Sequence, residues 1–333
     1  MGMEIEEQQV ESLFSMGKKL YVKNFIWSEE ERPGINHNDF AKEEDIPVIS
    51  LQGIMEVKPQ DMDCYEKVCR DMVDAGAEWG FFRLEDHGVA IEILENAKMQ
   101  LNKLFDLPME LKLKEVLQLL QSPEHVVSLA KRVFPGQHHP FSEAIIKYMH
   151  QLDRLGMRIF EMLAHGLGLP DAFFTKNFEK KEATIFRPSR CLPCPLPEKC
   201  LGLGNHSDPH TLTILLQDDD VGGLQILGDD NQWVGIRPVP NSFIVNLGDT
   251  LEVWTNGVLK SRAVLNKGNQ RQSVAYFLSP TSSAMIDSRP QLVDPIHNAW
   301  KFKPFTWGDF RNELISQKRV VGKTALNRYL ITQ

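Results

Sequence analysis

The sequence predicts a mixed α+β fold, with helices in its first half and antiparallel strands in its second half. Before residue 180, apolar residues recur at helical spacing over long segments. After Lys181, short β-rich runs separated by Asp, Gly, Asn and Pro follow one another, which is typical of an antiparallel sandwich or barrel. With 333 residues, 42% of them hydrophobic, the chain is long enough to bury a large core. We expect a helix-rich region over 1–180 and a β-rich region over 181–333, joined into one globule.

In the first half, the expected elements follow from periodicity and from stop signals. The stretch that contains Tyr65, Val68 and Met72 carries one apolar stripe at helical spacing. A later apolar stripe ends at a Gly- and Pro-containing segment, GLGLP, which is a helix stop signal. We expect strands over residues 46–51 and 80–84, and helices over residues 61–78, 90–107 and 141–163.

In the second half, the expected elements are short strands. Each is a run of five to seven residues rich in apolar and β-branched side chains, bounded by turn-forming residues. We expect strands over residues 211–216, 223–227, 232–236, 242–247, 251–255 and 272–278. No internal repeat and no low-complexity tract interrupts this pattern, so nothing indicates a repeat protein.

Charge and targeting signals exclude several classes of function. The formal net charge of −8 carries no electrostatic footprint for nucleic acid or for an anionic membrane. No apolar run approaches the 18 residues of a membrane span, and the acidic N-terminal segment is not a signal peptide. We therefore expect a cytoplasmic protein, monomeric, that acts on a small molecule, with no nucleic-acid or membrane partner.

The five cysteines are odd in number and do not form a disulfide-scaffold pattern, so we expect free thiols in a reducing compartment. Cys191 and Cys194 have the spacing of a CxxC pair. No second pair accompanies them, and the prolines around them suit a turn, so we expect neither zinc nor redox chemistry there.

One short stretch carries metal-ligand chemistry. His206 and Asp208 are two residues apart, and in a β-strand residues i and i+2 point to the same face. Both side chains could then reach one metal ion. Two protein ligands do not complete a metal site, so the sequence raises the question of a third.

Several motifs occur in a fixed order and together resemble the plant 2-oxoglutarate- and Fe(II)-dependent dioxygenases, which include flavonoid-pathway oxygenases and gibberellin oxidases. The motifs read IPVISL, EWGFFRLEDHGV, HGLGLP, CPLPEKCLGLGNHSDPHTLTILLQ, VGGLQIL, NSFIVNLGDTLEVWTNG and RQSVAYFLSP. The resemblance covers about residues 20 to 325. It implies a double-stranded β-helix, or jelly roll, preceded by a helical region. It also implies hydroxylation or desaturation of a small plant metabolite, with decarboxylation of 2-oxoglutarate to succinate.

The resemblance also assigns the site. It implies that His206 and Asp208 are two of the three protein ligands of Fe(II), the third being a second histidine. It implies that Arg271 and Ser273 hold the distal carboxylate of 2-oxoglutarate, since a guanidinium fork suits a carboxylate. Beyond the metal ligands it implies no separate catalytic side chain.

The chain departs from the family pattern where the third ligand should be. That histidine normally lies in a segment resembling NGxxKSxxHRxxxN, whereas residues 256–266 read NGVLKSRAVLN. The three residues that would end in the histidine are absent between Ser261 and Arg262, and residues 211–296 contain no histidine.

Two further departures affect ligands. The family's Asn and Tyr near 2-oxoglutarate are replaced by Ser189 and Cys191, and losing the phenol removes a hydrogen bond worth roughly 1.5–3 kcal/mol. Residues 113–122 are much shorter than the pocket-lining segment of relatives, which would alter or open the substrate site.

Other side chains are poor substitutes for the missing ligand. His210 continues the spacing of His206 and Asp208, but Pro209 interrupts the strand. Arg262 would repel Fe(II) if it fell near the metal, although an orientation to solvent is the simpler expectation. We expect His297 in a peripheral loop, His87 in a turn against the core, and Ser261 to be a weak neutral ligand.

Two functions remain open at this stage. One is an oxygenase that binds iron weakly and only with its co-substrate. The other is a catalytically inactive homologue that binds a ligand or a partner, or the product of a decayed gene. The incomplete iron site favours the second function, and the resemblance favours the first.

Overall fold

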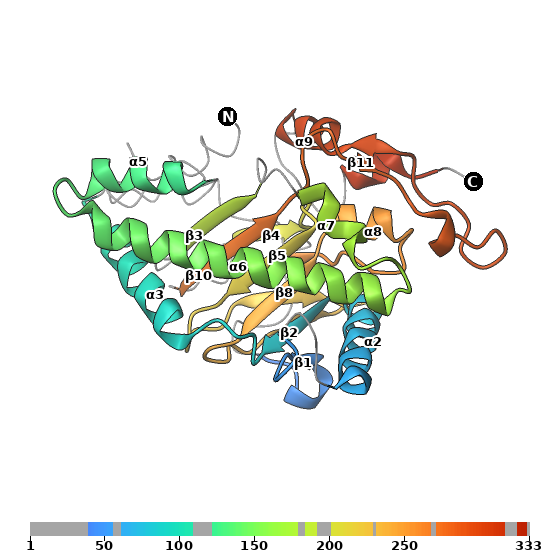
Figure 1. Cartoon of the computed structure of the whole chain (residues 1–333), viewed down its shortest axis with the longest axis horizontal. Helices are drawn as coiled ribbons and strands as arrows, with labels where there is room; N and C mark the ends of the chain where they lie inside the picture. The colour runs from blue at the N-terminus through green and yellow to red at the C-terminus, as the bar shows by residue number, and fades with distance from the viewer. Residues whose placement is uncertain are drawn as a thin grey trace.

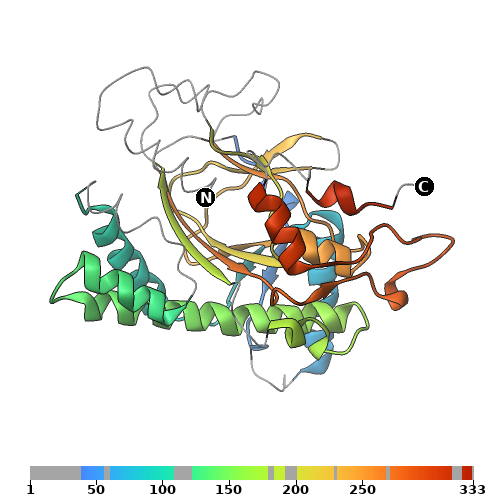
Figure 2. The same ribbon diagram turned by 90° about the horizontal axis from the view of Figure 1, so that it is seen from above.

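The computed structural model describes residues 39–55, 61–108, 122–178, 184–191, 201–228, 231–267, 271–316 and 325–331. Helices lie on one side of a curved six-stranded sheet, and a smaller sheet lies on the other side (Figures 1 and 2). The predicted mixed fold, with a jelly roll and an N-terminal helical region, is confirmed. Within the described residues no helix is both long and apolar enough to cross a membrane.

The helical layer is built around one long helix, α6. It spans His138–Gly166, and its apolar residues recur so that an entire face is buried. The neighbouring helices pack against α6 from both sides. The other helices are α2 (Met62–Glu78), α3 (Ile91–Phe105), α5 (Pro123–Val133), α7 (Ala172–Thr175), α8 (Asp249–Trp254) and α9 (Trp307–Ser316). Short 3₁₀ turns occur at Glu43–Asp45, Lys176–Phe178, Pro290–Leu292 and Leu326–Tyr329.

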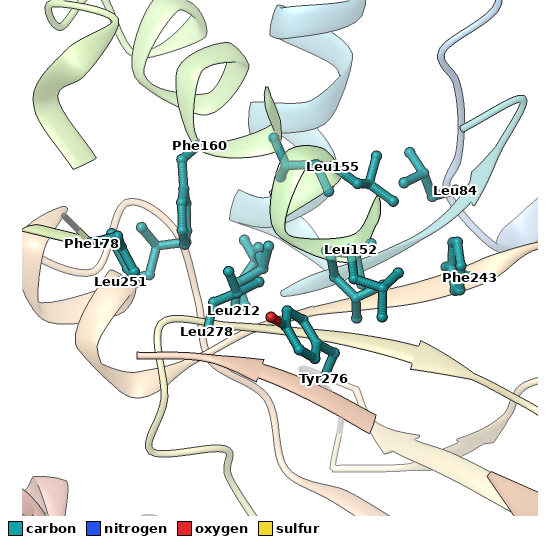
Figure 3. Close-up of a cluster of buried hydrophobic side chains, with 14 of the residues drawn as sticks. Leu84, Leu152, Leu155, Phe160, Phe178, Leu212, Phe243, Leu251, Tyr276 and Leu278 are labelled. Carbon is teal, nitrogen blue, oxygen red and sulfur yellow. The ribbon is translucent and has the colours of Figure 1, made fainter. Parts of the chain in front are cut away.

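The main hydrophobic core lies between α6 and the large sheet. Leu152 of α6 points toward the large sheet, and Figure 3 shows it beside Tyr276 of β10. Leu155 and Leu278 belong to the same buried core. Each of these side chains is at most 1% exposed. The phenol of Tyr276 also donates a hydrogen bond of 2.6 Å to the carboxylate of Asp153, which ties the sheet to the helix. One face of the large sheet is therefore committed to helix packing.

Two sheets form the β-sandwich. The larger has the strand order β1-β2-β8-β5-β10-β3, and the smaller has the order β4-β9-β6-β7. Apart from the parallel β1–β2 pair, neighbouring strands in both are antiparallel. The strands are β1 (Val48–Ser50), β2 (Phe81–Glu85), β3 (Ile185–Cys191), β4 (Leu201–His206), β5 (Leu212–Leu216), β6 (Leu224–Leu227), β7 (Trp233–Gly235), β8 (Phe243–Leu247), β9 (Val264–Lys267) and β10 (Arg271–Leu278). A separate hairpin pairs β11 (Met285–Ile286) with β12 (Phe305–Thr306).

The space between the two sheets has a hydrophobic cluster of its own. Leu215 and Ile244 of the large sheet meet Leu224 and Val264 of the small sheet there, and Ala275 of β10 packs against them. Because side chains alternate along a strand, this cluster identifies the inner face of each strand.

Strands from both halves of the chain share the large sheet. β2 pairs with β8, with Phe81 opposite Asn246, and β1 adds beyond it as an edge strand. The helix-rich region over 1–180 therefore supplies two strands to the sheet of the region over 181–333. The division into these two regions stays a prediction.

The predicted strand over residues 251–255 is wrong, because the segment forms helix α8. Leu251, Val253 and Trp254 are all buried, so the run shows no polar alternation that would tell a helix from a strand. Helix formation is favoured by Asp249 and Glu252 in the first turn, where carboxylates interact favourably with the helix N-terminus.

Candidate metal centre

His206 is the last residue of β4, and its side chain faces the space between the sheets. It lies directly opposite Val264 of β9, and side chains of cross-strand partners point to the same side. Its Nδ1 lies 2.8 Å from the carbonyl oxygen of Gly204. Since a carbonyl only accepts, Nδ1 carries a proton, which leaves Nε2 as the nitrogen that could bind a metal.

Asp208 also lies beside this space, but it is positioned by a loop and not by the strand that its spacing predicts. β4 ends at His206, so the two side chains are not aligned by a shared strand. Asp208 lies in the following loop, where its carbonyl accepts the amide of Asp249 at 2.8 Å. Thr213 of β5 donates its hydroxyl to Oδ2 of Asp208 at 2.6 Å. Asp208 is 6% exposed, so it does lie inward as predicted, but held by loop contacts.

The donor atoms of His206 and Asp208 are slightly farther apart than two ligands of one metal ion would be. Nε2 of His206 lies 3.6 Å from Oδ1 of Asp208. Two ligands at right angles with bonds of about 2.1 Å would have donor atoms about 3 Å apart, so a small closure completes the geometry. This pair of donors fits Fe(II), and their role as its ligands stays a prediction.

The attraction between His206 and Asp208 favours the charged form of each side chain despite their burial. Burial by itself would lower the pKa of His206, but the nearby carboxylate of Asp208 outweighs it and the pKa is raised. Burial would likewise raise the pKa of Asp208, but His206 and the hydroxyl of Thr213 outweigh it and the pKa is lowered. The carboxylate is thus available as an anionic ligand at neutral pH.

No third ligand joins them within the described ranges, where no group of three or more His, Cys, Asp or Glu is placed to hold a metal. Ser261 is buried, and its amide donates to the carboxylate of Glu252 at 2.7 Å. Arg262 extends away to donate to the carbonyl of Glu78 at 2.6 Å, and its stem covers Gly80. These contacts direct Arg262 to Glu78 and away from His206 and Asp208, as expected. That three residues are missing before Arg262 stays a prediction.

Two other histidines that were considered as ligands, His210 and His297, are engaged elsewhere. Nδ1 of His210 lies 2.6 Å from the hydroxyl of Ser279, and its ring packs on Phe277 at 4.6 Å. Burial lowers the pKa of His210 to about 4, so it is a neutral core side chain at pH 7. His297 is 79% exposed and pairs with Asp294 in a peripheral loop, as predicted.

The predicted 2-oxoglutarate residues lie on β10 and share its inner face. Arg271 and Ser273 alternate in phase with Ala275, which packs in the inner cluster, whereas Tyr276 contacts α6 on the other face. Arg271 is only 2% exposed. Arg271 thus faces the same space as His206, which is what binding one co-substrate requires. Ser189, which replaces the family's Asn, lies opposite Ser273.

Sequence reasoning missed one inner side chain, Arg187 of β3. It lies directly opposite Ala275, so it also faces the inner space. Its positive charge opposes protonation of both imidazoles, but it is a minor contribution: Asp208 outweighs it at His206, whose pKa is raised, and at His210 it adds to the larger effect of burial, which lowers the pKa. The signal was hidden because no strand was predicted over 185–191, and a residue cannot be given a face without a strand.

Two predictions fall partly outside the described residues. Of the shortened segment 113–122, only residue 122 is described. Cys194 of the CxxC pair lies outside the described residues. Of the cysteines within the described part, Cys64 and Cys69 are free thiols, as predicted.

Comparison with known proteins identifies the family. Residues 183–280 match the 2OG-Fe(II) oxygenase superfamily, and residues 46–143 match the non-haem dioxygenase in morphine synthesis N-terminal family. The chain is 33% identical over 318 residues to codeine O-demethylase of Papaver somniferum, covering 86% of this chain and 85% of that protein. The chain belongs to the 2-oxoglutarate- and Fe(II)-dependent oxygenase superfamily.

Other members of this superfamily show similar agreement over most of the chain. Gibberellin 20 oxidase 1 of Arabidopsis thaliana is 30% identical over 320 residues, covering 86% of this chain and 82% of that protein. The crystal structure of JOX2 in complex with 2OG, Fe and JA superposes with a TM-score of 0.72 at 28% identity, covering 93% of this chain and 94% of JOX2. Fe(II) and 2-oxoglutarate are the cofactor and co-substrate of the superfamily.

Proposed function

We propose that this superfamily member oxidises a small plant metabolite, by hydroxylation or desaturation, with an iron site that forms fully only when 2-oxoglutarate is present. One observation carries the proposal. His206 and Asp208 converge to 3.6 Å on the inner face, and the buried Arg271 faces the same space. A metal and a dicarboxylate could therefore occupy that space together.

Each side chain has a defined task in this proposal. Nε2 of His206 and the carboxylate of Asp208 would hold Fe(II), which when bound with 2-oxoglutarate supplies the O₂-dependent oxidising chemistry. Thr213 orients Asp208 by its 2.6 Å hydrogen bond. Arg271, with Ser273 beside it, would bind the distal carboxylate of 2-oxoglutarate. Because only two protein ligands are present, the two oxygens of 2-oxoglutarate become a larger share of the iron's coordination.

The relatives support a small-molecule substrate without naming it. The names of similar proteins refer to codeine, gibberellin and flavanone, which differ widely in shape. Substrate choice in one fold depends on the pocket, so we propose the class of substrate only. We also propose a cytoplasmic monomer without nucleic-acid or membrane partners, since the free thiols Cys64 and Cys69 suit a reducing compartment.

The missing third ligand favours a second candidate function. The amide of Ser261 is held by Glu252 and Arg262 by Glu78, so the strand closes where relatives carry the histidine. A chain of this kind could keep the fold and bind a small ligand without catalysing oxidation. The difference between the two candidates is whether iron binds.

Anaerobic titration with Fe(II), with and without 2-oxoglutarate, separates the candidates. The oxygenase proposal expects Fe(II) binding that tightens when 2-oxoglutarate is added, and the matched variant His206→Ala should abolish this tightening. Exchange of His297, which is exposed, should have no effect. Absence of Fe(II) binding in both conditions would leave the non-catalytic candidate.

A further inference from the structure

Two arginines from adjacent strands face the space that would hold the co-substrate. Arg271 begins β10, and Arg187 lies on β3, which pairs with β10. Both occupy inner-face positions, because Arg187 is opposite Ala275 and Arg271 is in phase with it. Only Arg271 belongs to the motif that the superfamily uses for the distal carboxylate.

The spacing of the two arginines suits a short ligand with two charged ends. In register, Arg187 is displaced by four residues from Arg271, or about 13 Å along the strand at about 3.3 Å per residue. Each guanidinium stands at the end of a flexible stem, so the two heads can approach the two ends of one ligand. Arg187 lies at the end nearer the pair of His206 and Asp208, because its partner Ala275 is only two residues from Phe277, which lies opposite the Thr213 that binds Asp208.

The charges around this space favour an anion. His206 and Asp208 are 3.6 Å apart and satisfy each other, and Thr213 takes up the second oxygen of Asp208. The imidazole of His210 is engaged by the hydroxyl of Ser279 at 2.6 Å, and Arg187 and Arg271 bring two positive charges to the inner face. Partly and fully buried guanidinium groups bind carboxylates strongly, since water competes less there.

We propose that Arg187 is a second anion-binding group of this site, so that 2-oxoglutarate or another short dicarboxylate binds between Arg187 and Arg271 without a metal ion. The inference rests on the proposed function for the place of the distal carboxylate at Arg271. It goes further, because the end of 2-oxoglutarate that would otherwise bind iron then has a protein partner. In a chain with two iron ligands, this partner makes ligand binding independent of the metal.

Isothermal titration calorimetry of the full chain in excess EDTA tests the proposal with three ligands. 2-Oxoglutarate has both carboxylates and the keto group, and glutarate has both carboxylates only. 2-Oxopentanoate keeps the keto acid end but lacks the distal carboxylate. We expect 2-oxoglutarate and glutarate to bind with similar affinity, and 2-oxopentanoate to bind at least about tenfold more weakly, because recognition is by two carboxylates.

Variants on β3 assign the effect to one side chain. Arg187→Gln should weaken metal-free binding of 2-oxoglutarate at least about tenfold, and Arg187→Lys should weaken it less because the charge remains. Arg190→Gln is the matched control, since Arg190 points to the opposite face and binds Asp106 and Asn102. It should bind 2-oxoglutarate like the unmodified chain. If Arg187→Gln does not fold, the Arg187→Lys variant and the comparison of the three ligands still test whether Arg187 binds a carboxylate.

The proposal is overturned if no dicarboxylate binds in EDTA, if glutarate fails to bind where 2-oxoglutarate does, or if Arg187→Gln binds as well as the control. These outcomes differ from failure of the proposed function, which is decided by Fe(II) titration. Metal-free binding without any Fe(II) binding would sustain this inference and remove the oxygenase. Fe(II) binding that needs 2-oxoglutarate, without metal-free binding, would do the reverse.

Discussion

At the scale of single residues, Thr213 determines how Asp208 is presented. Its hydroxyl donates to a carboxylate that is 6% exposed, at 2.6 Å. We expect Thr213→Val to lower the free energy of unfolding by about 1.5–3 kcal/mol at pH 7, because a buried charged acceptor loses its donor. Urea unfolding in EDTA measures this without any contribution from metal.

Thr213→Ser is the control for this prediction, since it keeps the hydroxyl and removes only a methyl group. It should recover most of the lost stability. Equal stability of the valine variant, the serine variant and the unmodified chain would show that the hydroxyl does not support Asp208.

His87 shows a second effect of burial at one residue. Its Nε2 lies 3.0 Å from the carbonyl of Asn241, and its Nδ1 accepts the amide of Val89 at 3.1 Å. The ring packs on Phe243 at 4.4 Å, so the predicted turn position against the core is confirmed. This arrangement needs the neutral imidazole, and burial accordingly lowers the pKa of His87.

The lowered pKa has a definite consequence for stability. Between the folded pKa and the ordinary value near 6.5, the unfolded chain binds more protons, so stability rises with pH. We expect the contribution of neutral His87 to the free energy of unfolding to be fully present above about pH 6.5. It should decrease as the pH drops towards the folded pKa. His87→Gln should make the profile shallower in urea unfolding between pH 7.5 and 5.5. The control His150→Gln, at an exposed position of α6, should keep the original profile.

At the scale of elements, the entry to β9 decides whether the iron site is complete. Arg262 is held by Glu78 just before β9 begins at Val264. Insertion of Val-Glu-His between Ser261 and Arg262 restores the superfamily spacing. We expect this insertion to raise Fe(II) affinity roughly 10–100-fold in anaerobic titration, at least the effect of a residue that supports a metal ligand.

The matched control is insertion of Val-Glu-Ala at the same place, which has the same length and no imidazole. It should bind Fe(II) no better than the unmodified chain. If both insertions raise the affinity equally, the length of the segment matters and the imidazole does not. If neither raises it, the absent histidine is not the defect of the site.

At the scale of the whole molecule, the two halves depend on each other. β2 covers one edge of β8, and α6 covers the outer face of β10 and β5. A fragment of residues 181–333 would expose that edge and that apolar face. We expect the fragment to show no cooperative transition in thermal or urea unfolding followed by circular dichroism, unlike the full chain. Co-expression with residues 1–180 should restore a soluble complex, and a cooperative transition of the fragment alone would contradict the prediction.

Local signals in the sequence determined much of the fold. The apolar stripe through Tyr65 and Met72 predicted a helix over 61–78, and α2 spans Met62–Glu78. A β-rich run bounded by turn residues predicted the strand over 242–247, observed as Phe243–Leu247. The prediction for segment 251–255 failed because the run is short and its apolar residues are all buried, so that no local pattern separates helix from strand. β3 and α5 were not predicted.

The sequence by itself determined the superfamily, the two-residue spacing of His206 and Asp208, and the lack of any histidine over residues 211–296, because these are matters of residue type and order. Only the tertiary structure decided how the pair is held. β4 ends at His206, and a loop bonded to β5 and α8 brings Asp208 back. Only the register of β3 against β10 placed Arg187 beside the site. The face of a strand depends on its pairing partner, which lies far away in the sequence, and so no local pattern specifies it.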